Sequence, residues 1–89
     1  MEIKGKIKVI EILDKEQYPK AKVVIVTDEE KYPQTIQIEF YEKLIPAVKT
    51  FNQGDDVVIA VNIKGREWVN QNLETKYFNT IVGWKITKL

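Results

Sequence analysis

An arginine and a tryptophan stand two residues apart in the last third of the chain, as Arg66 and Trp68. Residues at this spacing project from the same face of an extended strand, so the guanidinium and the indole ring would lie side by side. Single-stranded nucleic acids are commonly held by rings on which bases stack and by cations that follow the phosphates. The pair therefore predicts a nucleic-acid-binding site in which Trp68 is an exposed ring rather than part of the core.

Rings and cations are neighbours elsewhere in the chain as well. Tyr18 precedes Lys20 and Lys22, and these two lysines are included among the predicted binding residues. Aromatic side chains also supply much of the volume of a small core. The aromatic residues that we assign to the core are Phe40, Phe51, Phe78 and Trp84.

The chain contains no cysteine, no histidine and no serine. Nucleophilic catalysis by Ser or Cys, acid–base catalysis by His and Cys/His zinc sites are therefore excluded. The acidic groups at 28–30 and 55–56 lack the spacing of a calcium loop, and both stand where turns are expected. We therefore predict that the protein is not an enzyme and that it has no metal, no cofactor and no small-molecule substrate.

Eighty-nine residues predict one domain, residues 1–89, and 44% hydrophobic with 30% charged residues is an ordinary globular composition. The net charge of +1 argues against indiscriminate attraction to nucleic acid. No apolar run has the length of a membrane span, and the first residues do not resemble a signal peptide. A cytoplasmic location without membrane attachment is the expectation.

Hydrophobic alternation predicts five strands, because β-branched residues recur at every second position. The alternation slips by one residue at Val9–Ile10, which indicates a β-bulge. Between the third and fourth strands, apolar residues adopt helical spacing, which predicts a short helix from Glu42 to Thr50. A polar loop is expected at Asn70–Thr75. The predicted strands span Glu2–Leu13, Lys20–Thr27, Gln34–Tyr41, a fourth from Val57 to that loop, and Lys76–Lys88.

Three strands, a short helix and two further strands form the order of the OB-fold, a five-stranded Greek-key barrel. Closing the sheet into a barrel also removes the exposed edges that a chain so rich in strands would otherwise carry. The predicted fold class is therefore all-β, a five-stranded OB-fold barrel with one short helix between strands three and four. An open α+β sheet with the helix on one face is the alternative.

Several segments resemble the single-stranded DNA-binding protein family, and the whole chain resembles a small bacterial family with the same fold. The turn at Phe51–Val57 is similar to that family's turn into its fourth strand. Gly65–Trp68 is similar to the end of that strand, and Tyr77–Gly83 to the fifth strand. One departure is clear, because the stacking tryptophan of the family's third strand would fall near Gln34 or Thr35, and neither is aromatic.

The resemblance implies roles for two of these rings. Trp68 matches the base-stacking tryptophan at the end of strand four, and Tyr41 matches an aromatic position before the helix that also stacks bases. Tyr77, which begins one matching segment, and Lys64, which directly precedes another, are added as candidates. The complete predicted nucleic-acid-binding set is Trp68, Arg66, Tyr41, Lys64, Tyr77, Lys20 and Lys22.

The leading hypothesis is a non-catalytic module that binds single-stranded DNA, or alternatively RNA, with weak sequence preference. The rival is a protein-interaction or oligomeric structural module that uses the same barrel for a protein partner, because a fold does not determine a function. A small domain covers few nucleotides, so we also expect a homo-oligomer, a dimer or tetramer. We expect the copies to pair through the edge of the first strand of each chain.

Overall fold

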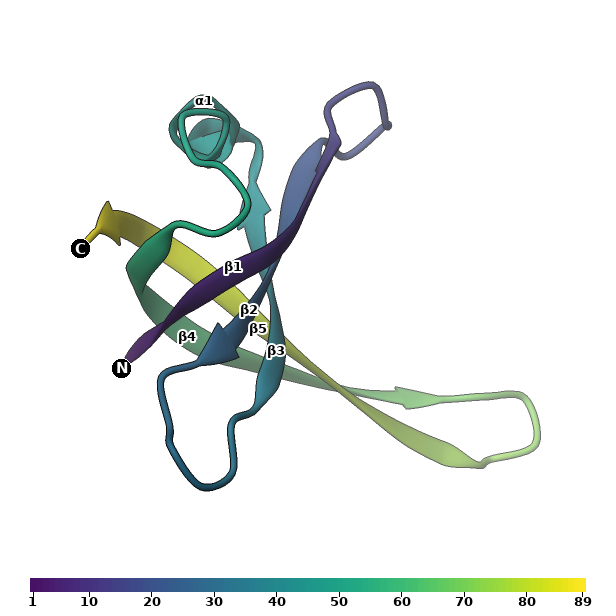
Figure 1. Ribbon diagram of the computed structural model, residues 1–89. Helices are drawn as coiled ribbons and strands as arrows, with labels where there is room; N and C mark the ends of the chain where they lie inside the picture. Colours follow the sequence, from purple (N-terminus) through teal and green to yellow (C-terminus); the bar gives the residue numbers. More distant parts are fainter.

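The alternating segments form a closed barrel of five strands in the computed structural model, which describes all residues, 1–89 (Figure 1). The strands lie in the order β1-β2-β3-β5-β4 around the barrel. The predicted OB-fold is thereby confirmed, and the open α+β sheet is wrong. The strands are β1 (Glu2–Leu13), β2 (Lys20–Thr27), β3 (Thr35–Tyr41), β4 (Asp56–Val69) and β5 (Thr75–Lys88).

Strand β1 joins the two halves of the barrel because it pairs with β4 through its first half and with β2 through its second half. Gly5 belongs to both ladders, opposite Val57 of β4 and Thr27 of β2. The predicted bulge is present, but the register shifts between Ile7 and Val9, before the predicted position. As a result Ile7 is buried, whereas Val9, predicted to share its face, is 39% exposed.

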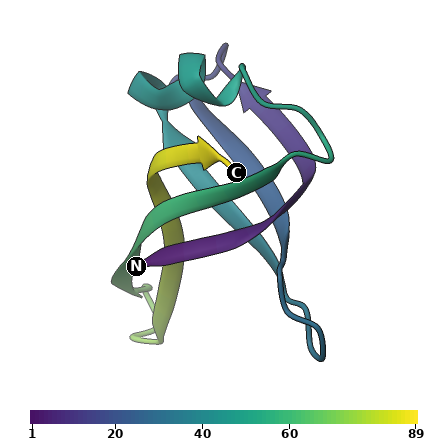
Figure 2. The ribbon, with the colours of Figure 1, turned by 60° about the vertical axis from the view of Figure 1, so that its left-hand side comes forward.

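The connection between β3 and β4 closes one end of the barrel (Figures 1 and 2). The predicted helix is present in a shorter form, as a 3-10 turn at Glu42–Leu44 followed by α1 (Ile45–Val48). A proline near the start of α1 is tolerated because the first N–H groups of a helix have no intrahelical partner. From this position Ile45 and Val48 pack into the core. With four residues, α1 is far too short for a transmembrane helix.

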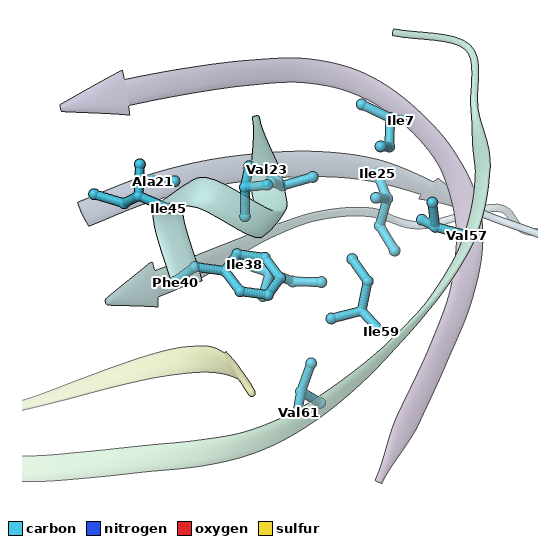
Figure 3. Close-up of a cluster of buried hydrophobic side chains, with 11 residues drawn as sticks. Ile7, Ala21, Val23, Ile25, Ile38, Phe40, Ile45, Val57, Ile59 and Val61 are labelled. Carbon is cyan, nitrogen blue, oxygen red and sulfur yellow. The ribbon is translucent and has the colours of Figure 1, made fainter. Parts of the chain in front are cut away.

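Inward-pointing residues of the strands fill the barrel, with Phe40 as the largest fully buried side chain (Figure 3). The prediction that Phe40 lies in the core is confirmed, and Phe51 packs against the core as a partly buried residue. The same prediction is wrong for Phe78 and Trp84, which are 44% and 54% exposed. Phe78 lies on a part of β5 that has left the barrel, and Trp84 lies at a bulge.

The bulge occurs where β5 changes its register on β4. Ala60 faces Lys85 and Val61 faces Gly83, so Trp84 has no partner on β4. Beyond this point β4 and β5 remain paired as far as Val69 and Thr75 and form a hairpin that projects away from the barrel (Figure 1). The predicted loop lies at its tip.

Asn70 fixes the tip of the hairpin. Its Oδ1 accepts hydrogen bonds from the backbone N–H groups of Asn72 and Glu74, each at 2.9 Å, as Asn side chains do in turns. Its backbone N–H also donates to the carbonyl of Glu74 at 3.0 Å. These bonds tie the two strand ends together, so the hairpin presents two ordered faces outside the barrel.

Gly83 allows β5 to cross closely over the largest core side chain. A Cβ atom at this position would lie 2.5 Å from Cε1 and Cζ of Phe40 and 3.0 Å from Cγ2 of Ile38. Both neighbours are fully buried and have no free space to move into. The absence of a side chain at Gly83 is therefore a condition for closing this side of the barrel.

We expect Gly83→Ala to lower the free energy of unfolding by about 1–3 kcal/mol, the usual cost of overpacking a core. Gly65→Ala is the matched control, because a Cβ there would lie 3.2 Å from Oδ1 of the exposed Asn79 side chain and at an ordinary contact distance, 3.9 Å, from the carbonyl oxygen of Phe78. Urea denaturation of both variants measures the difference. Equal stability of the two variants would contradict the role assigned to Gly83.

Candidate nucleic-acid interface

Strand pairing places the predicted cations and rings of the hairpin on one face. Arg66 of β4 lies opposite Phe78 of β5, and Trp68 lies opposite Lys76. Opposed residues in an antiparallel pair share a face, and residues two apart on one strand do as well. The Arg66 guanidinium carbon lies 5.5 Å from the centre of the Phe78 ring, within the range of a cation–π contact.

The end of β3 adds another ring to this face. The ammonium nitrogen of Lys64 lies 5.0 Å from the centre of the Tyr41 ring. Tyr41 and Lys64 line a shallow hollow of about 300 Å³ together with Arg66 and Phe78. The sequence separates Tyr41 from Lys64 by the helix and much of β4, so the barrel itself brings them together.

A second hollow, of about 410 Å³, adjoins the first and shares Tyr41 and Lys64 with it. Trp84 forms part of its wall. Rings and cations thus follow one another from the hairpin to the helical end of β3. We call this surface the aromatic–basic face, and its residues are Tyr41, Lys64, Arg66, Trp68, Lys76, Phe78 and Trp84.

The rings of the aromatic–basic face are open to solvent. Trp68 is 51% exposed, which confirms that it lies outside the core. Tyr41 is exposed to a similar extent. Solvent-exposed rings gathered on one surface indicate a binding surface rather than packing.

The cations of the aromatic–basic face have no acidic partners. Lys64, Arg66 and Lys76 form none of the protein's ion pairs. Their charges are therefore available to an anionic ligand.

Lys20 and Lys22 lie beside this face, at its edge on β2, and not within it. Lys20 is opposite Tyr41 in the β2–β3 ladder, but its ammonium pairs with the carboxylate of Glu39 at 3.5 Å. Lys22 is opposite Glu39 itself. The single carboxylate of Glu39 therefore offsets positive charge at this edge.

Tyr77 lies on the other face of the hairpin, because its partner Glu67 alternates with Arg66 and Trp68 along β4. It is 72% exposed and shares that face with the exposed side chains of Ile63 and Val69. The structure therefore separates Tyr77 from Trp68, although the sequence places both near the same loop.

Three residues of the face were not predicted from the sequence: Lys76, Phe78 and Trp84. Symmetric pairing across the predicted loop at 70–75 would place Trp68 beside Tyr77 instead. The observed loop is one residue shorter, because Thr75 already belongs to β5, and this one-residue difference brings Lys76 and Phe78 onto the face. The direction of Trp84 depends on the bulge.

The acidic turns have local structural roles. Asp55 accepts a hydrogen bond from the backbone N–H of Asn52 at 2.9 Å, and Asp56 pairs with Lys6 at 3.2 Å. At the opposite end of β1, a hydrogen bond and the positive charge from Lys49 lower the pKa of the Asp14 carboxyl below its ordinary value. Both sets of contacts lie outside the aromatic–basic face.

The chain is similar to solved structures of single-stranded DNA-binding proteins. The chain aligns over 100% of its length with 92% of the mitochondrial single-stranded DNA-binding protein Rim1 of S. cerevisiae, with a TM-score of 0.75 and 14% identity. It aligns to the same extent with the Plasmodium falciparum SSB from a complex with ssDNA, with a TM-score of 0.66 and 15% identity. At these identities the likeness establishes the OB-fold that the two proteins share with this chain.

Sequence comparison gives the family. Residues 2–87 match the model of a family described as a domain of unknown function, DUF3127, and the chain belongs to that family. A search among curated proteins finds no match.

Proposed function

We propose that this member of the DUF3127 family binds single-stranded DNA along the aromatic–basic face and acts through binding alone. The observation that carries the proposal is the alternation of exposed rings with unpaired cations on one surface. Each ring offers a flat apolar plane to a base, and each cation lies near enough to a ring to meet the adjacent phosphate. Stacking does not depend on the identity of the base, so weak sequence preference is expected over most of this surface.

DNA is proposed over RNA because one of the structures that share the fold holds ssDNA. RNA is the alternative ligand, since rings and cations serve both strands and only contacts to the 2′-hydroxyl distinguish them. Oligomers of dT and rU with equal length separate the two alternatives.

Trp68→Ala should weaken binding of a dT oligomer by about 1–3 kcal/mol, the usual contribution of one stacked base. The melting temperature should change little, because the ring is half exposed and lies outside the barrel. Tyr32→Ala is the matched control, since Tyr32 is an exposed ring in the β2–β3 loop and belongs to no part of the face. A large drop in melting temperature for Trp68→Ala, or equal affinity losses in both variants, would contradict the assignment.

Salt should weaken binding to a moderate degree. A single strand releases counterions with a slope of roughly −0.7 per phosphate contact, so three or four cations give a slope of roughly −2 to −3 in log K against log salt. Tryptophan fluorescence titrations with dT and rU oligomers at several salt concentrations measure this slope. Affinity that does not change with salt would exclude phosphate contacts by these cations.

A protein partner is the second candidate. It is favoured by the reverse face of the hairpin, where the exposed side chains of Ile63, Val69 and Tyr77 accompany a single charged residue, Glu67. Apolar surface of this kind is typical of protein interfaces and offers nothing to phosphates. Salt-independent association with a protein would support this candidate instead.

We also propose that copies of the chain associate through β1, as a dimer or tetramer. Glu2 and Ile3 pair with β4 but not with β2, and Val9–Leu13 pair with β2 but not with β4, so each end of β1 has one open edge. Open edges are templates for pairing with another strand. Light scattering at high micromolar concentration should give a mass near two or four times 10.4 kDa. A single species of 10.4 kDa would overturn this proposal.

A further inference from the structure

The larger hollow of the aromatic–basic face has the composition of a small-ligand site. Leu44 and the buried Val82 supply apolar surface, and the rings of Tyr41 and Trp84 belong to its wall. Its volume of about 410 Å³ lies in the range of sites that hold small organic ligands, which are mostly apolar with a few polar groups. The other hollow of this face is more polar in its lining and has no such apolar floor.

The β5 bulge produces this hollow. Val82 and Trp84 both line the hollow, but only Trp84 lacks a partner on β4. A bulge redirects the side chain of the extra residue, and here the redirected residue is a tryptophan that remains 54% exposed. Gly83, between these two residues, is buried against Phe40 and has no side chain that could fill the hollow.

Asn62 is the one amide side chain in the lining. It is exposed, and its amide makes no hydrogen bond within the protein, unlike the amide of Asn70, which is used in the hairpin tip. A free amide offers a donor and an acceptor side by side. Lys64 and Lys43 lie in the same lining, where their ammonium groups can meet a phosphate.

A nucleobase has two flat apolar faces and an edge with hydrogen-bond donors and acceptors. The rings and the amide of this hollow are complementary to such a ligand. We propose that this hollow takes one unpaired base of the bound strand, with its face against Tyr41 or Trp84 and its edge on the amide of Asn62. The inference rests on the proposed function and adds that one position of the strand is selective. Adenine is the base that we assign, with the edge that carries N7 facing Asn62. On this edge adenine alone has a donor, its amino group, beside an acceptor, N7, so it alone forms two hydrogen bonds with the amide.

The test compares a short dT oligomer with oligomers of equal length that carry one central dA, dC or dG. The wild-type protein should bind the dA oligomer at least about fivefold more tightly than the dT oligomer, which corresponds to the lower end of a bidentate base contact. Asn62→Leu keeps the shape of the side chain but removes both hydrogen bonds. In this variant the dA preference should disappear, while affinity for the dT oligomer stays within about twofold.

Asn79→Leu is the matched control. Asn79 is also exposed on the hairpin, but it lies opposite Gly65 on the reverse face and should leave the dA preference intact. Thermal melting of both variants establishes that each is folded. A wild-type protein that binds all four oligomers equally, or a dA preference that survives Asn62→Leu, overturns the selective position and leaves the proposed function standing. Failure to bind any oligomer at low salt overturns the proposed function itself.

Discussion

Closure of the barrel depends on two places where backbones approach too closely for a side chain. At the first, Gly5 of β1 pairs with both β2 and β4, and a Cβ atom there would collide with the carbonyl group of Val26. At the second, β5 passes over Phe40 at Gly83, beside the point where Val82 pairs with Glu39 of β3. A five-stranded sheet can close only if its two ends meet, and these glycines make that contact possible.

Closure also determines which part of β4 and β5 remains outside. Each strand has 14 residues, but the barrel uses only their ends toward Asp56 and Lys88. The remainder forms the hairpin, which accounts for a radius of gyration of 14.6 Å against roughly 12 Å for a compact domain of this length. Because the hairpin contributes little to the core, its rings and cations are free to serve binding without a large cost in stability. The core and the binding surface are thus built from different halves of the same two strands.

Sequence alternation was sufficient to predict the strands, because the face of a residue follows from its position within a strand. It predicted the limits of β1 and β2, and it identified Trp68 as an exposed ring. Alternation does not reveal where a strand leaves the barrel. Ile63 continues the pattern of Ile59 and Val61, yet it is 60% exposed because it lies in the hairpin.

Bulges are the second reason why part of the site was not predictable. The bulge at Trp84 depends on how β5 is registered on β4, and that register is fixed by contacts between segments distant in sequence. The face on which Tyr77 lies was not predictable for the same reason. Its separation from Trp68 follows from its pairing with Glu67 and not from its nearness to the loop.

The distribution of ion pairs explains how a nearly neutral protein can present a basic surface. Four lysines pair with carboxylates on the barrel and its loops: Lys6, Lys20, Lys49 and Lys88. The cations of the aromatic–basic face have no such partners, so the net charge of +1 conceals a local excess of positive charge. Outside this face the chain carries 11 basic against 13 acidic side chains, so a polyanion is attracted more strongly to the face than to the rest of the protein, whereas a uniformly basic protein would bind it in any orientation. Near-neutrality of the whole chain therefore favours placement of a strand over the rings rather than adsorption elsewhere on the barrel.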